Sequence, residues 1–365
     1  MKRFPGQFEL AVITIHQNLG LALEQAKQFR PECVVITGSI QDETMLRSFE
    51  EIPVRLLYGR EGLLEAAGMA DVDLAVNALV GSAGLEATMQ AIHAGTSIAL
   101  ANKEVLVMAG ELVRRTAEQK SVQLLPIDSE HSALFQCLQG EESRFVDKIY
   151  LTASGGPFLK RNKDTFSSIT VEEALKHPNW SMGKKVTIDS ATMMNKALEI
   201  IEARWLFKFK ADQIRVVVHP QSIVHSMIGF IDGSVKAQLG MPDMRIPISY
   251  ALTYPERWNA DYSPMHFDRI WELSFYPPDM DKFPALRLAY EVVETGGTAP
   301  AVLNGADESA VLLFLEGKIG FHQIPNIVEN ALNRHTVVAN PDLNAVLEAD
   351  RWVKAFIKDE FAPGS

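Results

Sequence analysis

The amino-acid sequence predicts an α/β protein with a parallel sheet near its N-terminus, an α+β middle domain and a helical C-terminal domain. Three observations support this prediction. Short β-rich runs alternate with helical patterns over the first third of the chain, strands surround one long helix in the middle, and only helical patterns occur near the end. The length of 365 residues also leaves room for two to three domains of ~150 residues each.

The first domain, residues 1–128, alternates predicted strands with predicted helices. The strands cover 8–15, 33–37, 74–79, 97–101 and 122–127, and the helices cover 21–29, 85–94 and 103–119. This alternation indicates a parallel sheet with helices on both faces. Such sheets bind ligands at the carboxyl ends of their strands, so the loops after Ala78, Ala101 and Ile127 are candidates for binding.

The rest of the chain divides into three parts. Residues 129–253 mix strands with one long predicted helix over Ser190 to Phe207, which indicates an α+β domain. Residues 254–279 are rich in proline and show little periodicity, which is typical of an ordered crossing linker. Residues 280–365 are helical, with helices predicted over 285–293, 306–316, 324–334 and 343–358.

Composition and charge exclude several classes of protein. The net charge of −11 argues against a wide nucleic-acid surface, although a small anionic ligand in a local basic pocket is compatible with it. The only two cysteines, Cys33 and Cys137, lie in separate apolar runs, so the sequence supports neither a disulfide framework nor a thiolate metal site and indicates a reducing cytoplasm. No apolar stretch is long enough to span a bilayer, and the N-terminus lacks a signal-peptide core, so we expect neither membrane insertion nor export.

Two carboxylates stand where a buried strand is predicted to end. Asp128 and Glu130 follow the apolar run 124–127, and their spacing places both side chains on one side of the chain. Oxygen ligands in this arrangement suit Mg²⁺ or Mn²⁺. A solvated acidic loop is the alternative, because many strands end in one.

The predicted helix that starts near Ser190 is apolar over most of its circumference, so its polar residues need partners. Asn195 and Glu199 lie four residues apart with Lys196 beside them, and these three side chains can meet one ligand. A surface ion pair between Lys196 and Glu199 is the alternative. Asp189 and Ser190 are good N-cap residues, and a helix start also favours a phosphate, although capping alone is the commoner explanation.

Two loops have compositions that suit ligand binding. Residues 152–158 contain small residues whose backbone amides can approach an anion, although Gly-Gly-Pro is as often a plain turn. Residues 177–185 carry an imidazole, an indole and two ammonium groups, which fits either a closing lid or a surface loop whose Trp180 packs on the core.

Three further polar positions lie in predicted strands or at a strand end. Lys103 stands where a strand ends and a helix begins, and it reaches either a ligand or solvent. The segment 219–225 contains two histidines in apolar context, and 241–245 contains an aspartate and an arginine. Either segment contributes to a site, or it holds a satisfied core histidine or a structural ion pair.

Taken together, these segments closely resemble the 1-deoxy-D-xylulose-5-phosphate reductoisomerase family in order and spacing over nearly the whole chain. The matching motifs are Ala101–Glu104, Pro126–His131, Thr152–Phe158, His177–Gly183, Asp189–Glu199, His219–Ser222 and Pro242–Arg245. The resemblance implies an NADPH-dependent enzyme of the non-mevalonate isoprenoid pathway, which converts 1-deoxy-D-xylulose 5-phosphate to 2-C-methyl-D-erythritol 4-phosphate. It also implies a Rossmann-like first domain, a divalent metal (Mg²⁺ or Mn²⁺, with Co²⁺ as a further possibility), and a cytoplasmic homodimer joined through strands of the middle domain.

The resemblance also implies a role for individual residues. The metal ligands are Asp128, Glu130 and Glu199. The substrate-binding residues are Ser129, Glu130, Ser154, His177, Trp180, Met182, Ser190, Asn195, Lys196 and Glu199, with Trp180 and Met182 on the lid. The catalytic residues are Lys103, Glu130, His177 and His219. The cofactor-binding residues are His16, Gln17, Asn18, Asn102, Lys103, Glu104 and Gly183.

The chain departs from the family pattern near its N-terminus. Family members open with a strand and a Gly-rich turn that holds the cofactor pyrophosphate, and the sequence contains no such segment. We therefore expect an N-terminally truncated Rossmann-like sheet with a gap between neighbouring strands, explained by a start codon assigned too late or by truncation. Gln17 also replaces the basic residue that relatives use to meet the adenosine 2′-phosphate, so NADPH and NADH both stay open as cofactors, with His16 as a compensating group.

Two other functions are compatible with parts of this pattern. One is a truncated fragment that binds the metal and the sugar phosphate without cofactor-dependent activity. The other is a different Rossmann oxidoreductase, similar to homoserine dehydrogenase, although the carboxylates and the lid motif argue against it.

Overall fold

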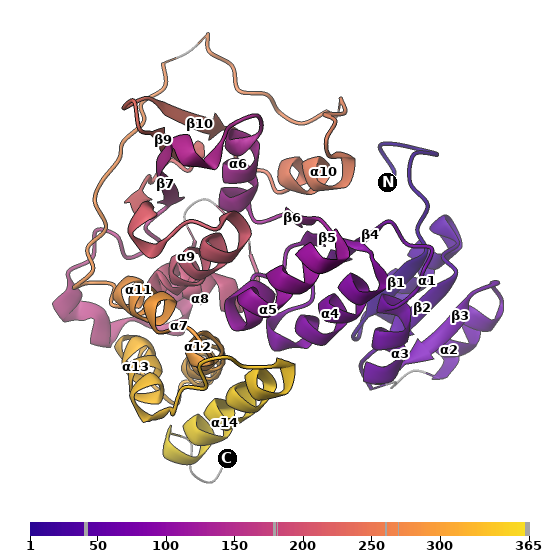
Figure 1. The fold of residues 1–365 in the computed structure, drawn as a ribbon. Coiled ribbons are helices and arrows are strands. Elements are labelled where there is room, and N and C mark those ends of the chain that lie inside the picture. The colour runs from indigo at the N-terminus through magenta and orange to yellow at the C-terminus, as the bar shows by residue number, and fades with distance from the viewer. Residues whose placement is uncertain (40–42, 178–179, 181, 260, 269, 362–365) are drawn as a thin grey trace. The chain divides into compact units, whose positions relative to one another are not determined.

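The computed structural model describes residues 1–39, 43–177, 180, 182–259, 261–268 and 270–361 (Figure 1). The chain forms two compact units. The first comprises Met1–Asn77, Leu85–Ile98 and Thr116–Gln123, and the second comprises Ala78–Gly84, Ala99–Arg115 and Leu124–Ser365. Among the described helices, none combines the length and the apolar character that crossing a membrane requires.

The first unit contains a three-stranded parallel sheet with helices on both faces. Its strands are β1 (Val12–Ile15), β2 (Cys33–Ile36) and β3 (Arg55–Tyr58), paired in that order. Its helices are α1 (Leu19–Phe29), α2 (Glu43–Glu50), α3 (Gly59–Ala67) and α4 (Gly84–Ala94). Alternate residues of β2 face opposite sides: Val34 and Ile36 join a core with Ala22 of α1, whereas Val35 joins Ala66 of α3.

The other strands of the predicted first domain form a separate sheet. They are β4 (Leu74–Asn77), β5 (Ser97–Leu100) and β6 (Leu124–Pro126), paired in that order. Among the described strands, β1 and β4 are not paired with each other. This break between the two sheets agrees with the gap expected from the sequence, in which a central strand has no counterpart.

The second unit contains a four-stranded sheet in the order β10-β9-β7-β8. The strands are β7 (Val146–Ala153), β8 (Ile214–Val218), β9 (Val224–Phe230) and β10 (Val235–Leu239). β7 is parallel to β8, while β9 is antiparallel to both β7 and β10. Helix α6 (Ser129–Leu138) contacts β9 and β10, and helix α9 (Met194–Phe207) contacts β7 and β8, so the sheet supports both helices that carry predicted metal ligands.

One predicted helix is in fact two. Instead of a single helix from Ser190 to Phe207, α8 (Lys184–Thr192) ends before α9 begins, and Met193 between them has φ of 61°. The hydroxyl of Thr192 bonds to backbone carbonyls one turn earlier and accepts from the amide of Met194, so it competes with helix continuation. The N-cap role predicted for Asp189 and Ser190 is therefore wrong, since both residues lie near the end of α8.

The remaining helices of the second unit lie before and after the predicted linker. They are α5 (Glu104–Lys120, whose last residues belong to the first unit), α7 (Val171–Ala174), α10 (Arg245–Thr253), α11 (Ala285–Thr295), α12 (Ala299–Leu315), α13 (Ile324–Arg334) and α14 (Leu343–Phe361). Helix α12 contacts α11, α13 and α14, which Figure 1 shows grouped in orange and yellow. It begins before the predicted start at 306, because Pro300 is tolerated in a first helical turn.

Candidate active site

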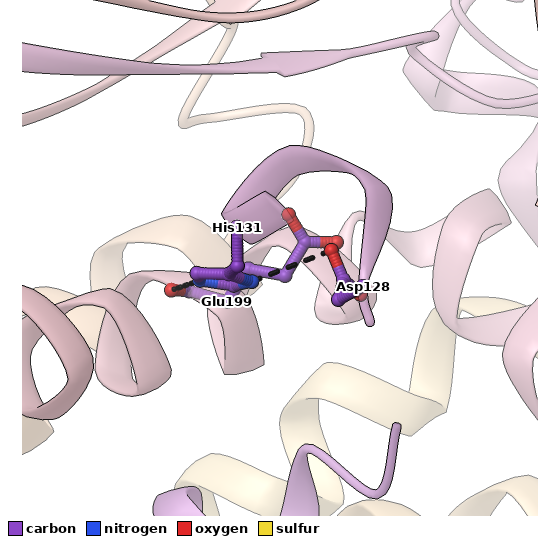
Figure 2. A group of neighbouring side chains, drawn as sticks. All are labelled: Asp128, His131 and Glu199. Atoms are coloured by element: carbon purple, nitrogen blue, oxygen red, sulfur yellow. Dashed lines mark hydrogen bonds and ion pairs between the residues drawn. The ribbon is translucent and has the colours of Figure 1, made fainter. Parts of the chain in front are cut away.

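The centre of the site lies where β5 and β6 lead into helices. Lys103 immediately precedes α5, and Asp128 is the N-cap of α6, where its Oδ1 accepts from the amide of Glu130 at 3.2 Å. Glu199 reaches the same place from α9, and Figure 2 shows it beside Asp128 and His131. The loops after β5 and β6 are two of those from which the sequence predicted binding.

Three carboxylates and two ammonium groups share this centre. Lys103 Nζ lies 2.6 Å from Asp128 Oδ2 and 3.5 Å from Glu199 Oε1. Lys196 Nζ lies 2.8 Å from Glu130 Oε1 and 2.5 Å from Glu199 Oε2. Lys196 and Glu199 thus form the predicted ion pair, but both side chains are buried, so the pair is not a surface feature. The acidic groups after β6 likewise are not a solvated loop, because they are bound to these lysines.

Asn195 connects the two halves of the cluster. Its amide nitrogen donates to Glu199 Oε1 at 2.6 Å, and its carbonyl oxygen accepts from Lys103 Nζ at 2.8 Å. Both oxygens of the fully buried Glu199 therefore accept hydrogen bonds from cationic or amide donors. A metal held by this carboxylate would have to replace at least one of these donors.

Burial and neighbouring charges shift the pKa values of these groups. Burial, reinforced by Asp128 and Glu130, raises the pKa of Glu199 to about 7. Burial alone would lower the pKa of Lys103, but Asp128 and Glu199 outweigh it and hold this pKa well above its usual value. Burial would likewise raise the pKa of Asp128, yet Lys103 and His131 keep it well below the usual range. Lys103 is therefore charged at neutral pH.

His131 connects the side chain of Asp128 with the backbone of Glu199. Its Nδ1 lies 3.3 Å from Asp128 Oδ1 and 3.2 Å from Glu202 Oε2, and its Nε2 lies 3.1 Å from the backbone oxygen of Glu199. Although burial opposes the charged imidazole, Glu202 and Asp128 raise the pKa of His131 to about 9. Because a backbone carbonyl accepts only, Nε2 carries a proton, and the charged ring donates from Nδ1 as well.

Sequence reasoning assigned no role to His131 or Glu202, and both help to organise the centre. The available signal was spacing: His131 lies three residues after Asp128, and Glu202 three residues after Glu199, which places each on the same helix face as its neighbour. Ligand atoms of Asp128, His131 and Glu199 lie within 4.8 Å of one another.

The donor set fits a magnesium-type ion. Asp128 and Glu199 supply carboxylate oxygens that lie within 4.8 Å of one another. Glu130 is joined to Glu199 through the ammonium group of Lys196, so the cluster as a whole attracts positive charge. The Nδ1 atom of His131 faces carboxylates instead, and its proton makes it a donor to them rather than a ligand. Glu130, which also accepts from the Ser129 hydroxyl, is the third carboxylate of the cluster.

The turn after β7 packs closely against α8. Gly156 has φ of 66°, and a Cβ at this position would lie 2.5 Å from the backbone oxygen of Ser190, so only glycine permits the approach. The amide of Gly156 donates to Ser154 Oγ at 3.2 Å, and His177 Nε2 lies 3.2 Å from the same hydroxyl. The Ser154 hydroxyl and the His177 ring are therefore adjacent, and the backbone of Ser190 lies against the same turn. Their roles in anion and sugar binding stay predictions.

The predicted lid is described only in part. Pro178, Asn179 and Ser181 lie outside the described residues. The amide of Trp180 donates to His177 Nδ1 at 2.9 Å, so this nitrogen is unprotonated and Nε2 carries the proton toward Ser154. Burial lowers the pKa of His177, in agreement with a neutral ring.

The two histidines of the 219–225 segment differ. The ring of His219 is satisfied by backbone: Nδ1 lies 2.9 Å from the Ser274 carbonyl, and Nε2 accepts from the amides of Ile223 and Val224. Among the described contacts of the His219 ring, none reaches the charged centre, and both ring nitrogens already bond to backbone groups. His225, which sequence reasoning left unassigned, instead lies beside Trp180 with ring centroids 6.5 Å apart. In the segment 241–245, Asp243 and Arg245 form a local ion pair.

The predicted cofactor residues fall in two places. His16, Gln17 and Asn18 follow β1 in the first unit, where Asn18 caps α1 by accepting from the amide of Leu21. In the second unit, Asn102 donates to the backbone oxygens of Leu79 and Gly81, next to Lys103 and Glu104. Gly183 is the N-cap of α8.

Comparison with known proteins decides the family. Models of the 1-deoxy-D-xylulose 5-phosphate reductoisomerase family match residues 1–110, and models of its C-terminal domains match 124–207 and 239–356. The 1-deoxy-D-xylulose 5-phosphate reductoisomerase of Chloroherpeton thalassium is 49% identical over 360 residues, which are 99% of this chain and 93% of that protein. The chain belongs to the 1-deoxy-D-xylulose 5-phosphate reductoisomerase family. The family assignment makes it an enzyme and excludes the alternative of an unrelated Rossmann oxidoreductase.

Solved structures of reductoisomerases confirm the α/β fold. A complex described as DOX-P reductoisomerase with NADPH, fosmidomycin and magnesium has a TM-score of 0.93 and 39% identity, and the match covers 99% of this chain and 93% of that one. The Zymomonas mobilis reductoisomerase in complex with NADPH has a TM-score of 0.91 and 38% identity, covering 98% of this chain and 92% of that one.

Proposed function

We propose that this chain isomerises 1-deoxy-D-xylulose 5-phosphate and reduces the product with NADPH to 2-C-methyl-D-erythritol 4-phosphate, in the non-mevalonate isoprenoid pathway. The observation that carries the proposal is the buried cluster in which Asp128, Glu130 and Glu199 meet Lys103 and Lys196. Relatives at 49% identity bear the reductoisomerase name, and related structures contain NADPH and magnesium.

Asp128, Glu130 and Glu199 are proposed to hold the divalent metal, Mg²⁺ or Mn²⁺. A cation there would stabilise negative charge on the neighbouring oxygens of the sugar while its carbon skeleton rearranges. His131 keeps Asp128 and the Glu199 backbone in place, so the carboxylates keep their positions between turnovers. Lys103, charged and adjacent to Asp128, donates to developing negative charge on substrate oxygen.

The phosphate and hydroxyl groups are proposed to bind along α8, α9 and the turn after β7. Lys196 and Asn195 supply a cation and an amide from the first turn of α9, while Ser154 and Ser190 supply hydroxyls. Because the phosphate does not react, its binding energy serves to orient the sugar. His177, Trp180 and Met182 cover the substrate and exclude water from the intermediate before hydride transfer.

The cofactor proposal rests on two groups of residues. Asn102, Lys103, Glu104 and Gly183 are proposed to contact the cofactor in the second unit, and the 16–18 segment in the first. Gln17 carries no charge, so a comparison of kcat/KM with NADPH and with NADH tests whether His16 supplies the missing recognition of the 2′-phosphate. Equal efficiency with both cofactors would contradict a preference for NADPH.

We also propose a homodimer in the cytoplasm. Among the described strands, β10 is an edge of its sheet and leaves one row of backbone groups unpaired. The side chains of Val235 on this strand and of Ile231 just before it are exposed, which gives the edge an apolar character. Sedimentation equilibrium of the protein tests the proposal, and a monomer at micromolar concentration would exclude it. The two buried, unpaired cysteines agree with a reducing compartment.

The deciding experiment is NADPH oxidation by this chain with 1-deoxy-D-xylulose 5-phosphate and Mn²⁺ or Mg²⁺. Consumption of NADPH that requires both sugar and metal supports the proposed function. Binding of the metal and the sugar phosphate without NADPH consumption would support the alternative of a fragment without cofactor-dependent activity. Calorimetry with Mn²⁺ alone separates a failure at the metal site from a failure at the cofactor site.

A further inference from the structure

A second buried charge cluster lies outside the candidate active site. Lys185 Nζ lies 2.7 Å from Asp189 Oδ2 on the same helix, α8, and 2.8 Å from Asp307 Oδ2 on α12. The side chains of Asp189 and Asp307 are 2% and 0% exposed, and that of Lys185 is 18% exposed. None of these residues contacts the three carboxylates of the site in the described structure.

The two ion pairs of this cluster join different elements. Lys185 and Asp189 are four residues apart on α8, so their pair stays within one helix. The contact with Asp307 instead joins α8 to α12, two helices that pack against each other. Burying two carboxylates with a single ammonium adds little to stability, since an apolar set of similar volume is often as stable. What such a contact supplies is a defined position of one helix on the other.

Helix α8 carries two parts of the proposed substrate site. The lid segment 177–185 runs into this helix: Gly183 is the N-cap of α8, and Lys185, where the segment ends, lies in its first turn. Ser190 lies in its last turn, where its backbone oxygen meets the turn at Gly156 so closely that a Cβ would clash. A small shift of α8 on α12 therefore displaces the end of the lid and a phosphate-binding residue together.

We propose that Asp307 is a positioning residue, which holds Lys185 and thereby fixes α8 so that Ser190 and the end of the lid segment meet the phosphate of the substrate. The assignment of the phosphate to Ser190 rests on the proposed function. The position of α8 does not depend on the proposed function, and it can be measured by itself. In this arrangement the C-terminal helices contribute to substrate binding through the position of α8.

The test compares Asp307→Asn with Asp350→Asn in the full chain loaded with Mg²⁺. Asp350 is a matched control, because it is a buried carboxylate of the same helical bundle that pairs with Lys354 and not with α8. Hydrogen exchange over residues 184–192 and the affinity for inorganic phosphate report on α8 without any turnover. KM and kcat for the sugar phosphate report on how the position of α8 affects substrate binding and turnover.

We expect Asp307→Asn to speed exchange over 184–192, to weaken phosphate binding, and to raise KM about tenfold with kcat within about threefold, because a small misplacement weakens binding geometry. Asp350→Asn should change none of these by more than about twofold. Exchange and phosphate affinity in Asp307→Asn that match the control overturn the proposal. If the wild-type chain has no activity, the proposed function fails, whereas exchange and phosphate affinity still decide the role of Asp307.

Discussion

Replacing Glu199 by Gln should make the metal-free protein more stable while it weakens metal binding. Burial with Asp128 and Glu130 raises the pKa of Glu199 from 4.5 to about 7. Because the folded-state pKa lies above the unfolded value, ionised Glu199 destabilises the fold, and the full penalty applies above pH 7 and disappears below pH 4.5. At about 1.4 kcal/mol per pKa unit, the penalty at pH 8 is about 3 kcal/mol.

Glutamine removes this charge and keeps the shape of the side chain. Part of the gain is lost, because its amide group meets the donors Lys196 and Asn195, which now bond to glutamate oxygens. We therefore expect the metal-free variant to be more stable than the wild type by about 1 to 2 kcal/mol at pH 8. The same change removes a proposed charged ligand and should weaken Mn²⁺ binding by about 100-fold or more.

Urea denaturation at pH 8, with and without Mn²⁺, measures both effects in one series. At a metal concentration of about 100 times its Kd, the wild type gains about 2.7 kcal/mol while the variant gains almost nothing, so the order of stabilities reverses. Glu202→Gln is the comparison, since it removes a second buried carboxylate of α9 whose pKa burial also raises to about 7. It should lose less metal affinity than Glu199→Gln. A metal-free Glu199→Gln protein that is less stable than wild type, or equal stabilisation by Mn²⁺, would refute the reasoning.

Three further predictions follow from particular contacts. Because folding raises the pKa of His131 from 6.5 to about 9, protonation of this ring stabilises the metal-free fold fully below pH 6.5 and progressively less up to pH 9. His131→Gln should flatten this pH dependence of the free energy of unfolding in urea titrations, and an unchanged slope would contradict the prediction. Gly156→Ala should lower stability by about 2 kcal/mol or more and raise KM, because the new Cβ meets the backbone oxygen of Ser190. Gly140 also has positive φ but faces open space, so Gly140→Ala should cost only about 1 kcal/mol in thermal denaturation and leave KM unchanged. Lys196→Met should raise KM for the sugar phosphate at least tenfold without changing NADPH affinity measured by fluorescence, and an equal loss of both would remove Lys196 from the phosphate site.

Local patterns predicted most of the elements, and their failures have local causes. The apolar runs near 33–37 and 97–101 became β2 and β5 because buried strands are continuous apolar segments. The break at Met193 was missed because the propensities of its neighbours favour one helix. It depends on where the hydroxyl of Thr192 bonds, and this contact exists only once both turns have formed.

The sequence by itself determined which chemical groups the chain carries and which segments carry them. The motifs around Asp128 and Glu199 predicted carboxylates, and the structure brings these carboxylates together. Only the tertiary structure decided which cations oppose them: Lys103 and Glu199 are 96 positions apart, and Lys196 meets Glu130 across 66. It also decided protonation, since the pKa values of Glu199 and His131 follow from burial and from neighbours on other elements. Residue identity and spacing act locally, whereas electric fields and solvent exclusion depend on how distant segments pack.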